Sequence, residues 1–360
     1  MKNPHFPHYN AVLTGSQLAY YLICKAIPVE IPHIANIEEL WEIHGQTAIK
    51  FKEMGKSGLN DQHLADGRSY LDLKVQISRK MLEHCEFCEN ACQTNRTTEQ
   101  LGFCGIPVTS RVSSVFLHYG EEPPLVPSGT IFFSGCTFNC VYCQNWDIST
   151  VGKRPPSEMR YNDERRSNGT PVDGKQLAVF ADALTRQNAN NINYVGGDPT
   201  PNLHTIIESM VYQDQSITQL WNSNFYNTIK SLNLLVDLMD FWLPDFKYGN
   251  NECAKRYSKI TNYWDVLTRN LKFIYEWGSR DIIIRHLVMP GHFNCCTKPI
   301  LKWIANEIPG TATNIMAQYH PEHEVNSKNY AEINRRVSHS EMVEAFSLAE
   351  RLNIPYKLVS

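Results

Sequence analysis

Three cysteines follow one short apolar segment and are close enough in sequence to share an inorganic ligand. Cys136, Cys140 and Cys143 form a C-x3-C-x2-C pattern shortly after the apolar residues 131–133. Three thiols are one more than a dithiol redox pair needs and one fewer than a closed tetrahedral zinc site requires. A four-iron cluster with one open iron suits three thiolates better. A zinc knuckle or an accidental group of thiols is the alternative.

Four further cysteines lie upstream in a polar segment rich in turn-forming residues. They are Cys85, Cys88, Cys92 and Cys104. Four thiolates can close a tetrahedral shell around one metal ion. A structural zinc ion and an auxiliary iron–sulfur cluster use the same ligand type, so the sequence leaves both open, together with four unligated thiols.

Composition sets bounds on the class of protein. The chain has 360 residues, 42% of them hydrophobic, and a formal net charge of -3, so bulk charge does not indicate a nucleic-acid or membrane partner. No apolar run approaches the ~20 residues of a membrane span, and the first residues lack the features of a signal peptide. Eleven cysteines, mostly at ligand-like spacings, indicate metal binding in a reducing compartment, and we expect a cytoplasmic protein.

The cysteine loop begins a regular alternation of strand-like and helix-like segments, which predicts parallel strands joined by crossovers. The six predicted strands are residues 130–134, 192–196, 217–221, 240–245, 282–288 and 314–319. Helices are predicted over residues 70–82, 177–184 (with Asp173 as a cap), 203–210, 300–308 and 342–352. Six units predict a partial (β/α)6 barrel rather than a closed barrel of eight.

The predicted organisation has three parts. A mostly helical N-terminal extension covers residues 1–84, a cysteine-rich metal-binding segment with a linker covers 85–127, and the α/β partial barrel covers 128–360. The polar segment 152–168 is an insertion that would either cover the site or form a solvated surface loop.

Functional groups of a parallel barrel gather at the C-terminal ends of its strands, because the following loops open on that face. The second predicted strand ends in Gly196-Gly197-Asp198, where glycines permit close approach of a ligand to the backbone. The fourth ends in Asp245 and Lys247, which point to the same side. The lysine could present its ammonium group to a ligand, or the two residues could simply form a surface ion pair.

The fifth predicted strand carries an arginine where a buried strand should be apolar. Arg285 follows three isoleucines, and an unpaired charge there would be costly, so we expect it to face a carboxylate or a cofactor. His286 and His292 follow, and a lone histidine of this kind is more often a structural residue than a catalytic one. Cys295 and Cys296 could reach the barrel mouth as reactive or ligand thiols, but we interpret them as structural, since adjacent cysteines rarely ligate one ion.

These motifs, in this order, resemble the radical S-adenosylmethionine (SAM) superfamily. More closely, the chain is similar to pyruvate formate-lyase activating enzyme and to its prokaryotic homologues with an extra upstream cysteine motif. The phrases that carry the resemblance are GFCG, CQN, GGDPTP, WNSN, PDFKY and RHLVMPGH, between about residues 85 and 319.

The resemblance implies a role for each matching position. The cysteines 136, 140 and 143 would ligate a [4Fe-4S] cluster, with Tyr142 beside the adenine of SAM. The implied contacts to SAM are Gly196, Gly197, Asp198, Asn224, Lys247, Arg285 and His292. Lys247 and Asp245 are the candidates for a catalytic role, with Asp245 helping to hold a monovalent cation. Activating enzymes usually have Asp-Thr-Asn-Gly where this chain has residues 222–225, so it lacks that carboxylate.

The implied activity is reductive cleavage of SAM followed by removal of a hydrogen atom from a substrate, as in an activating enzyme. The implied partners are a one-electron donor of the flavodoxin or ferredoxin type and a protein or other macromolecular substrate. Two alternatives stay open: a radical SAM enzyme of a small-molecule or RNA-modification pathway, and a non-enzymatic iron–sulfur or zinc protein that senses or carries electrons.

Overall fold

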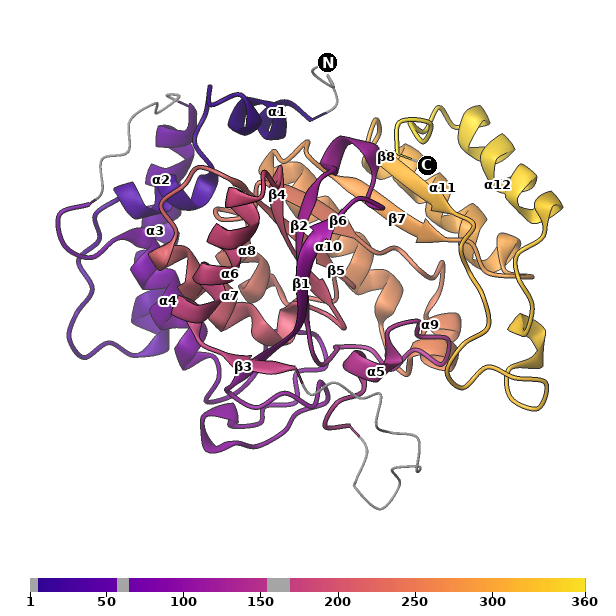
Figure 1. Cartoon of the computed structure of the whole chain (residues 1–360), viewed down its shortest axis with the longest axis horizontal. Coiled ribbons are helices and arrows are strands. Elements are labelled where there is room, and N and C mark those ends of the chain that lie inside the picture. The colour runs from indigo at the N-terminus through magenta and orange to yellow at the C-terminus, as the bar shows by residue number, and fades with distance from the viewer. Residues whose placement is uncertain (1–5, 57–64, 154–168, 360) are drawn as a thin grey trace.

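The centre of the molecule is a set of strands that curves into an incomplete barrel (Figure 1). The structure, a computed structural model, describes residues 6–56, 65–153 and 169–359. The strands found within these ranges are β1 Ser110–His118, β2 Ser128–Phe133, β3 Thr170–Val172, β4 Asn191–Gly196, β5 Thr218–Ser223, β6 Phe241–Pro244, β7 Ile283–Leu287 and β8 Ala312–Met316.

Six parallel strands build the barrel and confirm the predicted architecture. Parallel ladders join β2 to β4, β4 to β5, β5 to β6, and β7 to β8. The junction between β6 and β7 is weaker, because only single parallel bridges, Trp242 to Ile282 and Asp245 to Arg285, connect these two strands. The barrel therefore has a seam with few backbone hydrogen bonds between β6 and β7.

Two strands that the sequence did not predict extend the sheet beyond β2. Strand β1 pairs antiparallel with β2, and the short β3 pairs antiparallel with β1. Strand β1 belongs to the segment 85–127 that sequence analysis divided from the barrel, so part of that segment is continuous with the central sheet.

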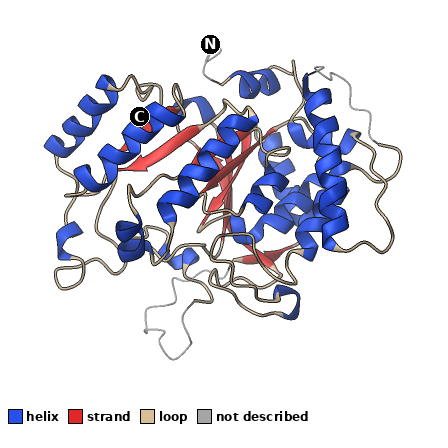
Figure 2. Ribbon diagram, turned by 180° about the vertical axis from the view of Figure 1, so that it is seen from behind, coloured by secondary structure: helices blue, strands red, loops and turns tan. Residues whose placement is uncertain are grey.

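Helices cover the outside of the sheet (Figure 2). They are α1 Pro7–Leu13, α2 Tyr20–Ala26, α3 Ile37–Lys56, α4 Tyr70–Lys80, α5 Trp146–Ser149, α6 Gly174–Arg186, α7 Leu203–Ser209, α8 Ile229–Leu235, α9 Asn251–Ser258, α10 Tyr263–Trp277, α11 Lys298–Glu307 and α12 His339–Arg351. The five predicted helices correspond to α4, α6, α7, α11 and α12. Asp173 caps α6 as predicted, in a reciprocal capping box with Gln176.

The N-terminal helices α2 to α4 form an additional layer outside the barrel helices α6 and α7 (Figure 1). A buried polar cluster joins this layer to the barrel. Lys74 Nζ donates to Asp237 Oδ2 at 3.2 Å and lies 2.9 Å from His44 Nε2. A charge that is fully buried needs such partners, so this cluster fixes α4 against the segment before β6.

The N-terminal end of the barrel is filled with apolar side chains. Those that lie on β6 and β7 point to the same face of the sheet as Asp245 and Arg285, because alternate residues of a strand point the same way. The cluster consists of Phe6, Tyr9, Leu125, Leu220, Phe241, Leu243, Ile283, Ala312 and Val359. Residues from α1 and from the C-terminal segment thus close the floor of the barrel, and the strand ends opposite remain for a site.

The predicted insertion and the absence of a predicted membrane span can be compared with the described residues. From residue 154 onward, the predicted insertion 152–168 lies outside the described residues. Of the helices that the structure describes, none combines the length and the apolar character needed to cross a membrane.

Candidate active site

A cavity lies at the C-terminal ends of the parallel strands. Its volume is about 900 Å³ when the open solvent at its mouth is included. Its walls are Cys136, Cys140, Tyr142, Cys143, Gln144, Asn145, Gly196, Gly197, Asn224, Asp245, Lys247, Arg285, Leu287, Met316 and Gln318. Ten of these were singled out from the sequence. Gln144, Asn145, Leu287, Met316 and Gln318 were not, because no chemistry marks such residues before the strand ends are placed together.

The three cysteines of the loop after β2 are held by polar neighbours. Cys136 Sγ accepts hydrogen bonds from Asn224 Nδ2 at 3.2 Å and from the Phe138 backbone N–H at 3.3 Å. The sulfurs of Cys140 and Cys143 lie 2.9 Å from Ser258 Oγ and 3.3 Å from Ser149 Oγ, respectively. Each thiol therefore has a fixed direction within the cavity wall.

Burial keeps these thiols protonated in the protein alone. It raises the pKa of Cys140 to about 11, and nearby Cys143 adds to the effect. Burial also raises the pKa of Cys136 and of Cys143 above the usual thiol value. Three buried thiolates side by side need compensating positive charge, which the iron ions of a cluster would supply. The donor set therefore fits a [4Fe-4S] cluster.

Gly196 and Gly197 are required because two backbone segments of the chain pack closely there. Gly196 has φ +127°, and a Cβ added there would lie 2.2 Å from the Phe133 backbone nitrogen. A Cβ on Gly197 would lie 2.1 Å from the Gly135 carbonyl oxygen, within the cysteine loop. These glycines let the loop after β4 lie directly against the loop that carries the thiols, besides lining the cavity.

Asp198 lies behind the cavity wall rather than in it. Its carboxylate accepts a hydrogen bond from Thr137 Oγ1 at 2.5 Å and one from the Asn224 backbone N–H at 3.4 Å. Burial raises its pKa to about 6. Asp198 thus joins the loops after β2, β4 and β5, and its implied contact with SAM stays a prediction.

Lys247 connects two strand ends inside the cavity. Its ammonium group donates to Asn224 Oδ1 at 3.0 Å and to Asp245 Oδ2. Burial acts to lower the pKa of Lys247, but Asp245 and the neighbouring cysteines outweigh burial and raise it. The lysine therefore carries its charge at neutral pH and presents it to the same space as the three thiols.

Arg285 faces carboxylates, one of the two environments expected from the sequence. Its guanidinium donates to Glu122 through Nε and Nη2, both at 2.8 Å, and to Glu121 Oε2 at 2.6 Å. Burial acts to raise the pKa of Glu122, but Arg285 outweighs it and holds that pKa below its usual range. Sequence reasoning missed both glutamates, because they precede Arg285 in the chain by 163 residues (Glu122) and 164 residues (Glu121).

Tyr142 lines the cavity with its ring and is anchored through its hydroxyl. The hydroxyl lies 2.7 Å from that of Tyr248, and the ring meets Tyr319 edge-on with centroids 5.5 Å apart. Burial raises the pKa of Tyr142, which stays a neutral aromatic surface. A flat adenine-like ring is a suitable partner for such a surface.

His286 on β7 and His292 after that strand lie outside the cavity lining. His286 is buried between the Phe246 carbonyl oxygen and Thr297 Oγ1, and burial lowers its pKa to about 4, which is consistent with a structural role. His292 lies beside Tyr257, Cys253 and Cys295. Its implied contact with SAM stays a prediction.

The upstream cysteines lie next to the cysteine loop of the cavity. Asn90 Nδ2 donates to the Thr137 carbonyl oxygen at 2.8 Å, and a Cβ on Gly135 would lie 2.9 Å from the Cys104 carbonyl oxygen. The sulfurs of Cys85 and Cys92 contact each other. The two cysteine-bearing segments therefore pack together, although the ligand of the upstream four stays a prediction.

Comparison with known proteins gives matches over the barrel and over nearly the whole chain. The model of the radical SAM superfamily matches residues 130–304. The uncharacterized protein MJ0674 of Methanocaldococcus jannaschii is 42% identical over 347 residues, which are 96% of this chain and 97% of the relative. A second protein of that organism, MJ0808, is 25% identical over 246 residues, or 66% of this chain and 67% of its own.

A solved structure matches part of the chain at low sequence identity. It is a domain of pyruvate-formate lyase-activating enzyme from Bacteroides vulgatus, which matches 47% of this chain and 98% of its own length. The TM-score is 0.37 and the sequence identity is 13%.

Proposed function

We propose that this chain abstracts a hydrogen atom from a substrate in the manner of an activating enzyme. The chain belongs to the radical SAM superfamily and is an enzyme of that superfamily. The observation that carries the proposal is the convergence on one cavity of three thiols, a glycine pair, a lysine and a half-buried arginine. When bound, a [4Fe-4S] cluster and SAM supply one-electron reductive cleavage of a sulfonium, the source of the hydrogen-abstracting radical.

The residues of the cavity hold and orient these groups. Cys136, Cys140 and Cys143 would ligate three irons, and Asn224 Nδ2 donates to the Cys136 sulfur, which stabilises negative charge on it. Lys247 presents a cation that suits the carboxylate of SAM. Tyr142 offers an aromatic surface for the adenine, and Leu287 and Met316 add apolar side chains to the cavity wall.

The substrate is proposed to be a protein or another macromolecule, and the reductant a one-electron donor of the flavodoxin or ferredoxin type. The support is the resemblance to activating enzymes, which act on a partner protein. Activating enzymes usually have an aspartate where this chain has Asn222, whose Oδ1 accepts a hydrogen bond from Arg285 at 3.5 Å. The lack of this carboxylate distinguishes the chain from activating enzymes. A partner other than a glycyl radical enzyme is compatible with that difference.

Anaerobic reconstitution with iron and sulfide, followed by dithionite and SAM, tests the chemistry. We expect 5′-deoxyadenosine and methionine by mass spectrometry from the wild-type protein and none from Cys140→Ala. The matched control is Cys24→Ala, which removes a buried thiol that donates to the Asp237 carbonyl oxygen far from the cavity. Absence of 5′-deoxyadenosine from a wild-type protein with a full cluster contradicts the proposal.

The substrate class is tested separately. Cell extract is divided by size, and each fraction is added to the reconstituted enzyme. We expect the high-molecular-weight fraction to increase 5′-deoxyadenosine formation, and trypsin treatment of that fraction to abolish the increase. Stimulation only by the small-molecule fraction would place the enzyme in a small-molecule pathway, and stimulation abolished by ribonuclease would indicate RNA.

A further inference from the structure

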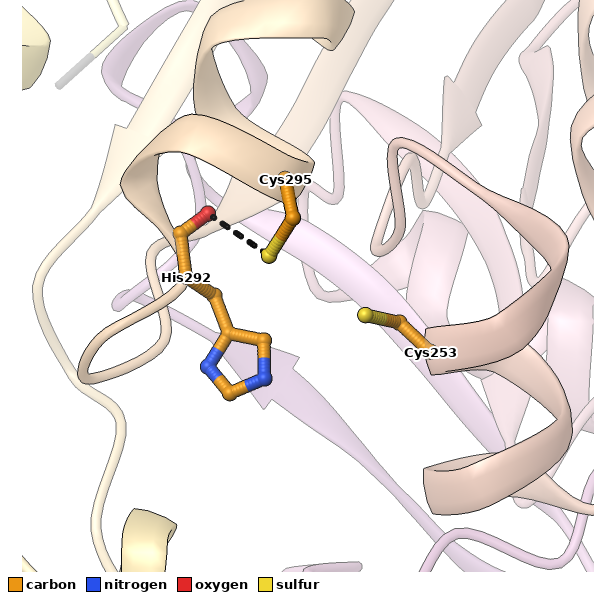
Figure 3. Close-up of side chains that lie close together, drawn as sticks. All are labelled: Cys253, His292 and Cys295. Atoms are coloured by element: carbon orange, nitrogen blue, oxygen red, sulfur yellow. Dashed lines mark hydrogen bonds between the residues drawn. The ribbon is translucent and has the colours of Figure 1, made fainter.

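A separate group of metal-ligand side chains lies outside the cavity. The sulfurs of Cys253 and Cys295 and a ring nitrogen of His292 all lie within 4.8 Å of one another. Figure 3 shows the imidazole and both thiols facing one space from two segments, helix α9 and the π-helical turn Phe293–Thr297. We propose that these three side chains bind a divalent metal ion of the zinc class, independently of the cluster and SAM.

The hydrogen bonds of His292 leave the Nε2 lone pair available. Nδ1 lies 2.7 Å from the Pro290 carbonyl oxygen, which can only accept, so Nδ1 carries the proton. The Tyr257 hydroxyl lies 3.2 Å from Nε2, but it donates its single hydrogen to Glu332 Oε1 at 2.8 Å. With Nδ1 protonated, the other ring nitrogen of a neutral imidazole offers its lone pair to the space beside Tyr257 and the Cys253 thiol, which also contacts the ring. A carbonyl acceptor on the other ring nitrogen is the usual arrangement for a metal-bound histidine.

Asn250 fixes the two ligand-bearing segments against each other. Its Oδ1 accepts from the Cys253 backbone N–H at 2.7 Å and caps α9, while its Nδ2 donates to the Cys295 carbonyl oxygen at 2.8 Å. A Cβ on the preceding Gly249 would lie 2.6 Å from the same carbonyl oxygen. The ligands are thus positioned by close backbone packing, which lowers the entropy cost of binding an ion.

The ligand types select the ion. Thiolate and imidazole ligands in a set of three suit zinc, which is tetrahedral and keeps one further position for water or another donor. Both thiols lose their protons when the ion binds, so two positive charges of the metal replace two protons. Oxygen-preferring ions such as magnesium or calcium find no carboxylate among these three side chains.

The position of the group indicates what the ion would do. Helix α9 follows β6, and the π-helical turn follows β7, so the ligands span the seam where only two single bridges join the strands. An ion here would hold the loop after β6, which carries Lys247, beside the strand that carries Arg285. The site is therefore a structural clamp across the weakest part of the barrel.

Zinc content of the reconstituted holoenzyme tests the proposal. The protein with its iron–sulfur cluster in place is incubated with zinc chloride alone, freed of unbound metal, and analysed for zinc and iron. We expect Cys253→Ser/Cys295→Ser to hold about one zinc per chain fewer than the wild type, with the same iron content. His292→Asn should lose zinc as well, whereas His339→Asn, an exposed histidine at the start of α12, should keep it.

Two further measurements keep the test decisive if the double variant folds poorly. Cobalt(II) added to the wild type should give thiolate charge-transfer absorption, and X-ray absorption of the zinc form should show nitrogen together with sulfur, unlike a site of four cysteines. Equal zinc in wild type and variants, all-sulfur coordination, or a Cys253–Cys295 disulfide in anaerobically purified protein would overturn the proposal. None of these outcomes depends on cleavage of SAM, so they are independent of the proposed function.

Discussion

Lys247 links two other side chains of the cavity wall, and its environment decides what its removal should do. The ammonium group lies between Asn224 Oδ1 and Asp245 Oδ2, next to the cluster thiols. Among the residues that the structure describes, its side chain hydrogen-bonds only to Asn224 and Asp245 of the cavity wall. Its loss should therefore affect ligand binding more than the fold.

We expect Lys247→Met to weaken SAM binding while the iron content stays normal. A hydrogen bond to a charged group contributes about 1.5–3 kcal/mol, which corresponds to a roughly 10- to 150-fold rise in Kd. Equilibrium dialysis of SAM against the reconstituted enzyme measures the change. Lys302→Met, at an exposed position of α11, is the matched control and should bind SAM like the wild type. An unchanged Kd for Lys247→Met would rule out the assigned contact.

At the same scale, the sequence predicted the type of partner of Arg285 but not its identity. A buried arginine requires a carboxylate, and this requirement follows from the cost of an isolated charge. Choosing Glu122 would have required knowing that a segment 163 positions earlier enters the barrel. The group of Cys253, His292 and Cys295 was missed for the same reason, since α9 and the turn after β7 meet only in the fold.

At the scale of elements, the loops after β2 and β4 depend on each other. A side chain at position 197 would collide with the cysteine loop, because its Cβ would lie 2.1 Å from the Gly135 carbonyl oxygen. Backbone atoms cannot move aside as a flexible side chain can. The cysteine loop should therefore shift if any side chain is added here.

We expect Gly197→Ala to destabilise the fold by about 1–3 kcal/mol through overpacking and to prevent full cluster assembly. Gly45→Ala is the matched control, because Gly45 lies within α3 with no atom near its missing Cβ. That control should stabilise the protein by about 0.5–1 kcal/mol, the helix advantage of alanine over glycine. Thermal unfolding and iron–sulfur absorbance measure both effects. Normal absorbance in Gly197→Ala would show that the loops adjust independently.

The elements themselves were predictable where their pattern was continuous. Strands β4, β5 and β6 are buried on both faces, as parallel strands covered by helices are, and the apolar runs indicated them. Strand β1 contains a short apolar run at residues 115–117, but two serines stand at its centre and these apolar residues are half-buried or exposed, so the sequence pattern did not mark it as a core strand. The three-residue β3 contains a proline and is defined only by its pairing with β1.

At the scale of the whole molecule, one ion pair joins the two ends of the open barrel. Glu122 lies in the segment between β1 and β2, whereas Arg285 and Asn314, which both donate to it, lie on β7 and β8. The side chain of Glu122 is 1% exposed and that of Arg285 is 16% exposed. The first and last strands of the barrel are thus connected through its interior without a backbone ladder.

We expect Glu122→Gln to destabilise the protein by about 3 kcal/mol, because removal of one partner leaves a buried charge poorly compensated. Denaturant unfolding measures the loss, and protease sensitivity should rise at β7 and β8 first. Glu350→Gln, which removes an exposed ion pair between Glu350 on α12 and Lys357 beyond it, should leave stability unchanged. Equal stability of the two variants would mean that Glu121 alone is sufficient to hold Arg285.

This interior ion pair also has a consequence for biosynthesis. Glu122 leaves the ribosome 192 residues before Asn314, its partner on β8. At ~5–20 residues per second, the acidic segment waits roughly 10–40 s for that partner. Through this interval β8 is absent, so the cysteine loop after β2 is made well before the last strand that completes the barrel around it.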